Sequence, residues 1–230
     1  MQLSMERNDL QEYVRRQLNT FYPDSYDFKG KDVDAAFDLA LERLENCFKY
    51  ITFPAYCNQK DQTYFSHLHS DQYSQFLYYL SNTLWNTSEN KPLCDKLIFL
   101  NKQLSGMFFS YKGKLPDIFL LGHPVGTILG NAVYNDFLVV FQNVTVNTDS
   151  DENGNPAPVL GKGLFLGAGA KIIGNKPVGD RVSIGVDALV YNQEIGDDKV
   201  VIKDACGNVL VKDRKKEECM AQRYFNVPIK

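Results

Sequence analysis

The sequence of 230 residues has no long run of apolar residues and no large excess of charge of one sign. Its longest apolar runs, such as residues 76–80 and 98–100, are far shorter than the roughly 18 residues that cross a bilayer. The 25 basic and 28 acidic residues leave a net charge of −3, the wrong sign for collecting nucleic-acid phosphates. The charged start of the chain also lacks the apolar stretch of a signal peptide. We therefore expect a soluble, cytoplasmic protein without nucleic-acid or membrane partners.

Paired cysteines are absent as well. The 5 cysteines stand singly in the sequence, and no two of them form a Cys-x-x-Cys pair. Neither a disulfide framework nor a thiolate zinc site is indicated, so we expect reduced, mostly structural thiols and no metal. The composition, 44% hydrophobic and 23% charged, is that of a globular protein with one large or two small domains.

The composition changes at Pro116. The residues before it hold 21 of the 29 aromatic side chains, whereas those after it hold 13 of the 16 glycines. Before this point apolar residues recur at helical spacing over residues 10–21, 33–48 and 73–84, and a fourth helix is expected from Pro92 to about Gly106. Ser70 or Asp71 would cap the third helix. The sequence thus predicts a helical domain over residues 1–112.

The part after Pro116 has a period of six residues. Two series keep this spacing: Leu160, Leu166, Ile172, Val178, Ile184 and Val190, and before them Ile128, Tyr134, Val140 and Val146. Glycine often follows these positions, and small or apolar residues stand four places on. Such a hexapeptide repeat is typical of a parallel β-helix, with a strand on each face and a turn at each corner. An antiparallel sandwich is the alternative. We expect an α+β chain, with the β-helix over residues 113–195 and a C-terminal hairpin and tail over 196–230.

The two series are out of step. Val146 and Leu160 are fourteen residues apart, about eight more than the repeat needs, and the polar stretch 147–156 lies between them. The surplus predicts a loop that leaves the β-helix, either to build a site or as flexible decoration. Residues 200–203 and 208–211 flank a Cys-Gly turn, which predicts a terminal hairpin that would cap the open end of the β-helix.

His123 is the one histidine of the repeat region, and glycines at 122 and 126 surround it. A lone histidine is usually structural. However, an imidazole, with an ordinary pKa of about 6.5, can take a proton from a hydroxyl or amine near neutral pH. His123 is therefore the candidate general base. A single histidine also argues against a β-helical carbonic anhydrase, whose zinc needs three.

Residues 123–133, 142–146 and 166–175 resemble the serine acetyltransferases and related hexapeptide acyltransferases, and residues 71–80 are similar to that family's acceptor-binding helix. The resemblance implies a left-handed β-helix, a homotrimer or dimer of trimers, and acetyl-CoA held between neighbouring β-helices. It also implies His123 as general base and Asp71 as an acceptor-binding residue, beside which His67 and His69 would line the pocket. The implied coenzyme contacts are Gly167, Ala168, Lys171, Val186 and Thr148.

The sequence also departs from this family. Gly122 stands where the family has a carboxylate before the histidine, and Pro156 and Ala157 stand where it has a basic residue and a second histidine. Asp117 is a candidate to replace the acidic partner of the imidazole. We therefore expect an acetyl-CoA-dependent transferase that acetylates a hydroxyl or amine of a sugar or polysaccharide precursor. Serine O-acetylation in cysteine biosynthesis is the alternative, and a non-catalytic trimeric β-helix is the third reading.

Overall fold

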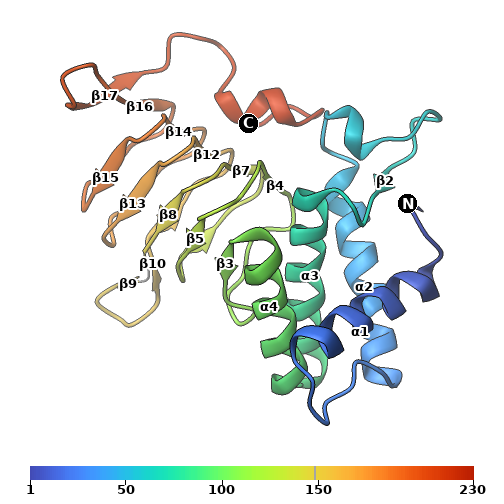
Figure 1. Cartoon of the computed structure of the whole chain (residues 1–230). Coiled ribbons are helices and arrows are strands. Elements are labelled where there is room, and N and C mark those ends of the chain that lie inside the picture. Colours follow the sequence, from blue (N-terminus) through green and yellow to red (C-terminus); the bar gives the residue numbers. More distant parts are fainter. Residues whose placement is uncertain (148) are drawn as a thin grey trace. The chain divides into compact units, whose positions relative to one another are not determined.

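The computed structural model describes residues 1–147 and 149–230, which form two compact units (Figure 1). The first unit comprises Met1–Lys49 and Phe53–Lys112, and the second comprises Tyr50–Thr52 and Gly113–Lys230. The short segment Tyr50–Thr52 thus belongs to the second unit although its neighbours in sequence belong to the first. Thr148, one of the expected coenzyme contacts, lies outside the described residues.

Four α-helices form the first unit within the described residues, as the apolar spacing predicts. They are α1 (Arg7–Phe21), α2 (Lys31–Phe48), α3 (Ser70–Ser88) and α4 (Lys91–Ser105), joined by β1 (Gln2–Leu3), β2 (Tyr64–Phe65), η1 (Pro54–Tyr56) and β3 (Phe108–Phe109). Helix α3 packs against both α2 and α4, and all its residues from Asp71 to Leu84 are buried. A helix that is buried on every side lies at the centre of its unit. None of the helices in these ranges is long and apolar enough to cross a membrane.

The helix caps agree only partly with the sequence. The side chain of Asn90 caps α4 by accepting a hydrogen bond from the Leu93 amide at 3.3 Å, as N-cap asparagines do. The expected cap of α3 is wrong, because Ser70 and Asp71 are its first two helical residues and His69 takes the cap position. The Ser70 hydroxyl instead donates to the Asp71 carboxylate at 3.1 Å.

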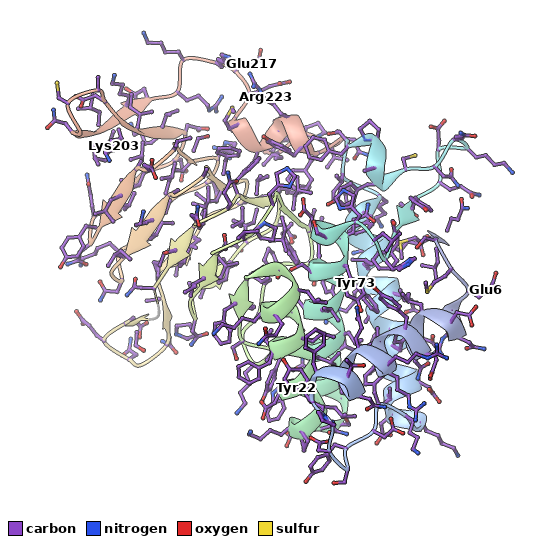
Figure 2. The ribbon with its side chains drawn as sticks, viewed as in Figure 1. Glu6, Tyr22, Tyr73, Lys203, Glu217 and Arg223 are labelled. Atoms are coloured by element: carbon purple, nitrogen blue, oxygen red, sulfur yellow. The ribbon has the colours of Figure 1, made fainter. Side chains whose placement is uncertain are left out.

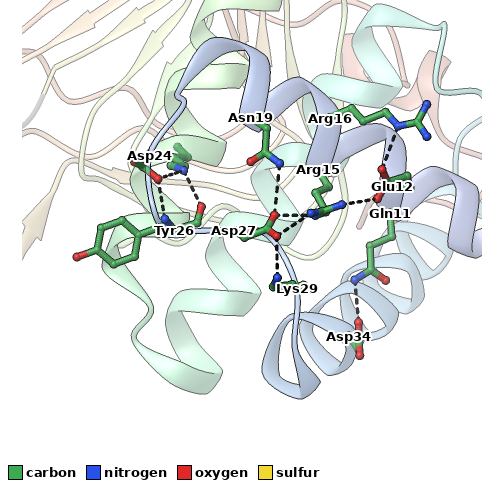
Figure 3. A network of polar contacts seen from close by, with 11 residues as sticks. Gln11, Glu12, Arg15, Arg16, Asn19, Asp24, Tyr26, Asp27, Lys29 and Asp34 are labelled. Atoms are coloured by element: carbon green, nitrogen blue, oxygen red, sulfur yellow. Dashed lines mark hydrogen bonds and ion pairs between the residues drawn. The ribbon is translucent and has the colours of Figure 1, made fainter.

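Charged contacts fasten the loop between α1 and α2 (Figure 3). Arg15 donates from Nε and Nη2 to the two carboxylate oxygens of Asp27, at 2.6 and 2.7 Å. These hydrogen bonds hold the pKa of Asp27 well below its usual range. The buried Lys96 of α4 donates to Asp24 and, at 2.6 Å, to the carbonyl of Tyr26. The loop is therefore attached to both α1 and α4.

The strands of the second unit stack in three series, which are the faces of a β-helix (Figure 1). The first face contains β4 (Phe119–Leu121), β7 (Leu138–Val140), β12 (Phe165–Leu166), β14 (Ser183–Ile184) and β16 (Lys199–Lys203), all parallel. The second face contains β5 (Ile128–Leu129), β8 (Thr145–Val146), β13 (Lys171–Ile173) and β15 (Leu189–Tyr191). The third face contains β6 (Val133–Tyr134) and β11 (Val159–Leu160), followed by single bridges at Val178 and Ile195.

The strand register gives the length of each coil. Lys171 pairs with Leu189, so the coil between them is exactly three hexapeptides long. The preceding coil is longer, because Thr145 pairs with Lys171 and the step between them exceeds three hexapeptides by eight. The extra residues include the antiparallel pair β9 (Asp149–Ser150) and β10 (Pro156–Ala157). The predicted surplus is therefore confirmed, and it leaves the β-helix as a small hairpin.

The interior of the β-helix contains the repeat residues that the sequence predicts, with one exception. The six aliphatic residues from Leu160 to Val190 are each at most 2% exposed. In the first coil the buried residue is Leu129, 3% exposed, whereas Ile128 is 50% exposed. Leu129 pairs with Val146, so their separation in sequence is one residue shorter than three hexapeptides. A shift of one residue moves a side chain to the other side of a strand.

Glycine allows successive coils to touch at one corner of the β-helix. A side-chain carbon added at Gly161 would lie 2.3 Å from the carbonyl carbon and oxygen of Gly179 in the next coil. The amide of Gly161 donates to the carbonyl of Val178 at 2.7 Å, which holds the coils at this separation. A residue with a side chain therefore does not fit at this position.

The C-terminal residues cover the first face. Strands β16 and β17 (Val209–Asp213) form the predicted hairpin, with β16 parallel to β14 at the end of that face. The chain then returns past Glu217 to η2 (Met220–Tyr224), which includes Arg223 (Figure 2). The Tyr224 ring stacks on Phe165 with 5.9 Å between centroids. The amide of Thr52 donates to the carbonyl of Tyr224 at 3.0 Å, so the segment Tyr50–Thr52 is held by this tail.

Candidate active site

The corner between β4 and β5 is larger than the corner stacked on it. Phe119 of β4 pairs with Leu138 of β7, whereas Ile128 of β5 pairs with Thr145 of β8. The separation in sequence from Phe119 to Leu138 is one residue longer than three hexapeptides, and the separation from Ile128 to Thr145 is one residue shorter. The corner of the first coil therefore holds two more residues than the corner of the second. His123 lies in this enlarged corner, two positions after the end of β4, so the insertion displaces the chain from the regular turn at the candidate base.

His123 is exposed and has a left-handed backbone conformation, with φ of 50°. Its carbonyl accepts a hydrogen bond from the Val125 amide at 2.7 Å, and the preceding Gly122 amide donates to the carbonyl of Val140 at 2.8 Å. The imidazole thus extends from a tight turn that is anchored on the second coil. A side-chain carbon at Gly122 would lie 3.0 Å from the Phe141 ring, so a carboxylate there would require that ring to move.

Thr127 fastens the other end of the enlarged corner. Its fully buried hydroxyl donates to the carbonyl of Phe141 at 2.8 Å and accepts from the Val144 amide at 3.3 Å. Both of these partners belong to the corner of the second coil. Buried hydroxyls with two such bonds fix the backbone around them. The turn that carries His123 is therefore fastened on both sides, by Gly122 and by Thr127.

The coenzyme candidates lie on the same corner as His123, in the coils that follow. Val125, Gln142, Ala168 and Val186 occupy matching positions in successive coils, and we call them the corner row. Backbone hydrogen bonds of 2.9 Å connect each member to the next coil: Asn143 N to Val125 O, Gly169 N to Gln142 O, and Asp187 N to Ala168 O. Neighbouring coils are separated by about 4.8 Å, so the row leads from the turn of His123 to Val186 over roughly 14 Å.

The later part of the corner row combines an exposed side chain, a small side chain and bare backbone. Val186 is 63% exposed and Ala168 is half-buried with a single methyl group. A side-chain carbon at Gly167 would lie 3.1 Å from the carbonyl oxygen of Ile184, so the backbone here is closely packed and bare. Lys171 donates from Nζ to the carbonyl of Gly169 at 2.9 Å, which keeps its ammonium beside the same corner.

Asp117 does not lie beside His123. It precedes β4, and the neighbouring amide of Ile118 donates to Asp136 at 3.0 Å, at the other end of the strand. At about 3.3 Å per extended residue, the three residues of β4 alone place about 10 Å between the ends of the strand that separates Asp117 from His123. The suggestion that Asp117 orients the imidazole is therefore wrong for residues within one chain.

The acceptor candidates lie together at the start of α3, in the first unit. Asp71 is buried in the first turn, and His69 precedes it with its Nδ1 buried and without a hydrogen-bond partner among the described residues. The Tyr56 ring meets His69 edge-on at 5.8 Å. Burial, with the Asp71 carboxylate as a second cause, raises the pKa of Tyr56 well above its usual range.

His67 is oriented differently from His69. Its Nδ1 lies 2.8 Å from the Ser4 hydroxyl, and its ring packs edge-on against Tyr13 at 5.1 Å. This histidine therefore holds the N-terminal segment, while His69 has an uncommitted buried nitrogen. Within the described ranges no group of three histidine, cysteine or acidic side chains is arranged to hold a metal ion.

Comparison with known proteins bears on the fold of the chain and on the family that it resembles. No model of a known protein family matches the chain. The chain is 28% identical over 119 residues to the serine acetyltransferase of Synechococcus elongatus, covering 51% of this chain and 49% of that protein. It is 32% identical over 117 residues to the serine acetyltransferase of Salmonella typhimurium, covering 49% and 41%. The chain thus spans less than half the length of these curated relatives.

A solved serine acetyltransferase from Neisseria gonorrhoeae superposes with a TM-score of 0.68 at 18% identity, over 95% of this chain and 85% of that one. The chain has the fold of the serine acetyltransferases. The expected fold class is thereby confirmed: a helical domain, then a left-handed parallel β-helix with a C-terminal hairpin. The serine acetyltransferase-like resemblance read from the repeat residues is confirmed as well.

Two residues of this candidate site were not expected from the sequence. Thr127 and Gln142 both stand within the stretches that carry the resemblance, but neither position had a chemical signal of its own. The spacing of the apolar residues points to the segment that contains Thr127, because the separation of the buried residues Leu121 and Leu129 is not a multiple of six. Only the stacking of coils shows that Gln142 lies next to the turn of His123.

Proposed function

We propose that the protein is an acetyl-CoA-dependent O-acetyltransferase in which His123 is the general base. The observation that carries this proposal is the enlarged corner, which presents an exposed imidazole at one end of the corner row. In the reaction, His123 takes the proton of the acceptor hydroxyl, and the hydroxyl oxygen attacks the carbonyl carbon of the thioester. The carbon–sulfur bond then breaks, and the imidazolium returns the proton to the departing thiolate.

We propose serine as the first acceptor to test. The curated relatives and the solved structures bear the name serine acetyltransferase, which favours serine over the sugar or polysaccharide precursor expected from the sequence. Asp71 at the start of α3 supports it, because a buried carboxylate suits the ammonium group of an amino acid. A sugar hydroxyl is the second candidate, because Gly122, Pro156 and Ala157 remove polar groups that would recognise an amino acid.

The donor and the assembly are part of the same proposal. Acetyl-CoA would lie along the corner row with its pantetheine arm over Gly167 and Ala168, near Lys171 and Val186. A homotrimer would place this row in a groove shared with a second copy, as the family resemblance implies.

The test is release of free thiol from acetyl-CoA, followed with a chromogenic disulfide in the presence of serine, nucleotide-linked sugars or oligosaccharides. The proposal expects turnover with serine that is absent in His123→Ala. Turnover with a sugar but not with serine would support the acetyltransferase activity and show that the acceptor is a sugar. No turnover with any acceptor would leave the non-catalytic β-helix as the better account.

A further inference from the structure

Gln142 is the member of the corner row next to the turn of His123. The amide of Asn143 donates to the carbonyl of Val125, and the carbonyl of Gln142 accepts from Gly169, so Gln142 lies between the Val125 and Ala168 coils. Val125 in turn donates to the carbonyl of His123 at 2.7 Å. Gln142 is therefore one coil, about 4.8 Å, from the turn that carries the imidazole.

The side-chain amide of Gln142 is uncommitted. Its Oε1 is buried and has no hydrogen-bond partner, and its Nε2 makes no hydrogen bond to any residue in 1–147 or 149–230. Burial of an unpaired amide atom destabilises a fold, and an apolar side chain of the same size would avoid this cost. A polar group kept in this state is characteristic of a site whose partner arrives with a ligand.

The other members of the row between His123 and Val186 are Val125 and Ala168, which have no polar side-chain atoms. Among the members of the row that a thioester would follow to His123, Gln142 is therefore the one with a side-chain donor. The carbonyl oxygen of the thioester gains negative charge when the acceptor attacks it. A donor that is free of competing partners can stabilise that charge without first breaking another hydrogen bond.

We propose that Gln142 is a catalytic residue whose Nε2 donates a hydrogen bond to the thioester carbonyl oxygen as it becomes an oxyanion. This inference rests on the proposed function, because it needs acyl transfer at His123.

The experiment compares Gln142→Met and Gln142→Glu with the wild type by steady-state thiol release. Both substitutions keep the approximate size of the side chain and remove the amide donor. Gln103→Met, on the exposed side of α4, is the matched control for the chemical change. For the two Gln142 variants we expect kcat to fall roughly 100- to 1,000-fold, the usual effect of losing one oxyanion donor. The KM for acetyl-CoA and the dissociation constant of CoA should stay within about threefold.

Thermal unfolding separates catalysis from structure. The melting temperature of Gln142→Met should equal or exceed that of the wild type, because the substitution removes an unpaired buried oxygen. A kcat within threefold of the wild type in both variants would overturn the inference, as would a loss of kcat that comes with a lower melting temperature or lost CoA binding. Absence of turnover in the wild type would instead overturn the proposed function, and this inference with it.

Discussion

The left-handed backbone conformation of His123 limits which residues can replace it without strain. Few residues with a side chain adopt a φ of 50°, and asparagine does so more readily than most. Residues at other corners of the β-helix, such as Asn143 and Asp187, share this conformation. Because His123 provides both the imidazole and this turn, a test of the base should keep the backbone unchanged.

His123→Asn is the substitution that meets this condition. Asparagine tolerates the turn but cannot accept the acceptor's proton, so we expect kcat to fall roughly 100- to 10,000-fold with little change in melting temperature. Thiol release and thermal unfolding of the same preparation provide the check. A variant that unfolds earlier would show that the imidazole stabilises the turn, and a variant that keeps its activity would exclude His123 as the base.

Thr127→Val tests the fastening of the enlarged corner. The change keeps the shape of the side chain but leaves the Phe141 carbonyl and the Val144 amide without this partner. We expect a loss of about 1–3 kcal/mol in the free energy of unfolding, measured with urea. Thr127→Ser, which keeps the hydroxyl, is the control and should lose less. Equal losses in the two variants would show that the methyl group and not the hydroxyl matters.

Asp198 should make the corner beyond β15 sensitive to acid. Hydrogen bonds from Arg181 and Arg214 lower the pKa of Asp198 to about 2, below the ordinary value near 3.9. A lowered pKa means that the contribution to stability is complete above about pH 4 and is lost as pH falls toward 2. Asp198→Asn should therefore reduce stability at pH 6 and flatten its decline in this range. A parallel decline in both proteins would contradict the assignment.

At the level of elements, the coils depend on contact between backbones at the Gly161 corner. Gly161→Ala places a methyl group against the carbonyl of Gly179, 2.3 Å away by the ideal geometry, and backbone cannot yield as a side chain would. We expect a loss of roughly 1–3 kcal/mol, the usual effect of overpacking. Gly196→Ala, at the matching corner of the last coil, meets only Lys199 at 3.9 Å and is the control. Similar effects at the two positions would contradict this account.

The elements differ in how far the sequence could predict them. The helices and the coils from Leu160 onward follow from periodic burial, because each turn or coil repeats the same environment. The corner at His123 breaks that repetition by two residues, and the sequence alone does not show how Ile128 and Leu129 divide between outside and inside. The predicted cap of α3 was also wrong. Ser70 and Asp71 are both residue types that favour the cap position, but the helix begins at Ser70 and His69 takes the cap position.

At the scale of the whole molecule, one face of the β-helix has apolar side chains that its own chain leaves exposed. Ile128 and Leu189 lie on one outward row of the second face, and Tyr191 extends the face at β15. Their exposures are 50%, 39% and 70%. The first face is different, because the C-terminal tail covers it. Exposed apolar surface of this kind is characteristic of a contact between proteins.

The proposed homotrimer supplies that contact and gives the last prediction. Light scattering after size exclusion should give about three times the chain mass of 26.2 kDa, or a multiple of it. Leu189→Glu places a charge on the outward row, so it should release monomers while circular dichroism stays that of the folded chain. Because the coenzyme groove would be shared between copies, the monomeric variant should also lose acetyl-CoA turnover. A wild-type monomer that retains turnover would contradict both the trimer and the shared groove.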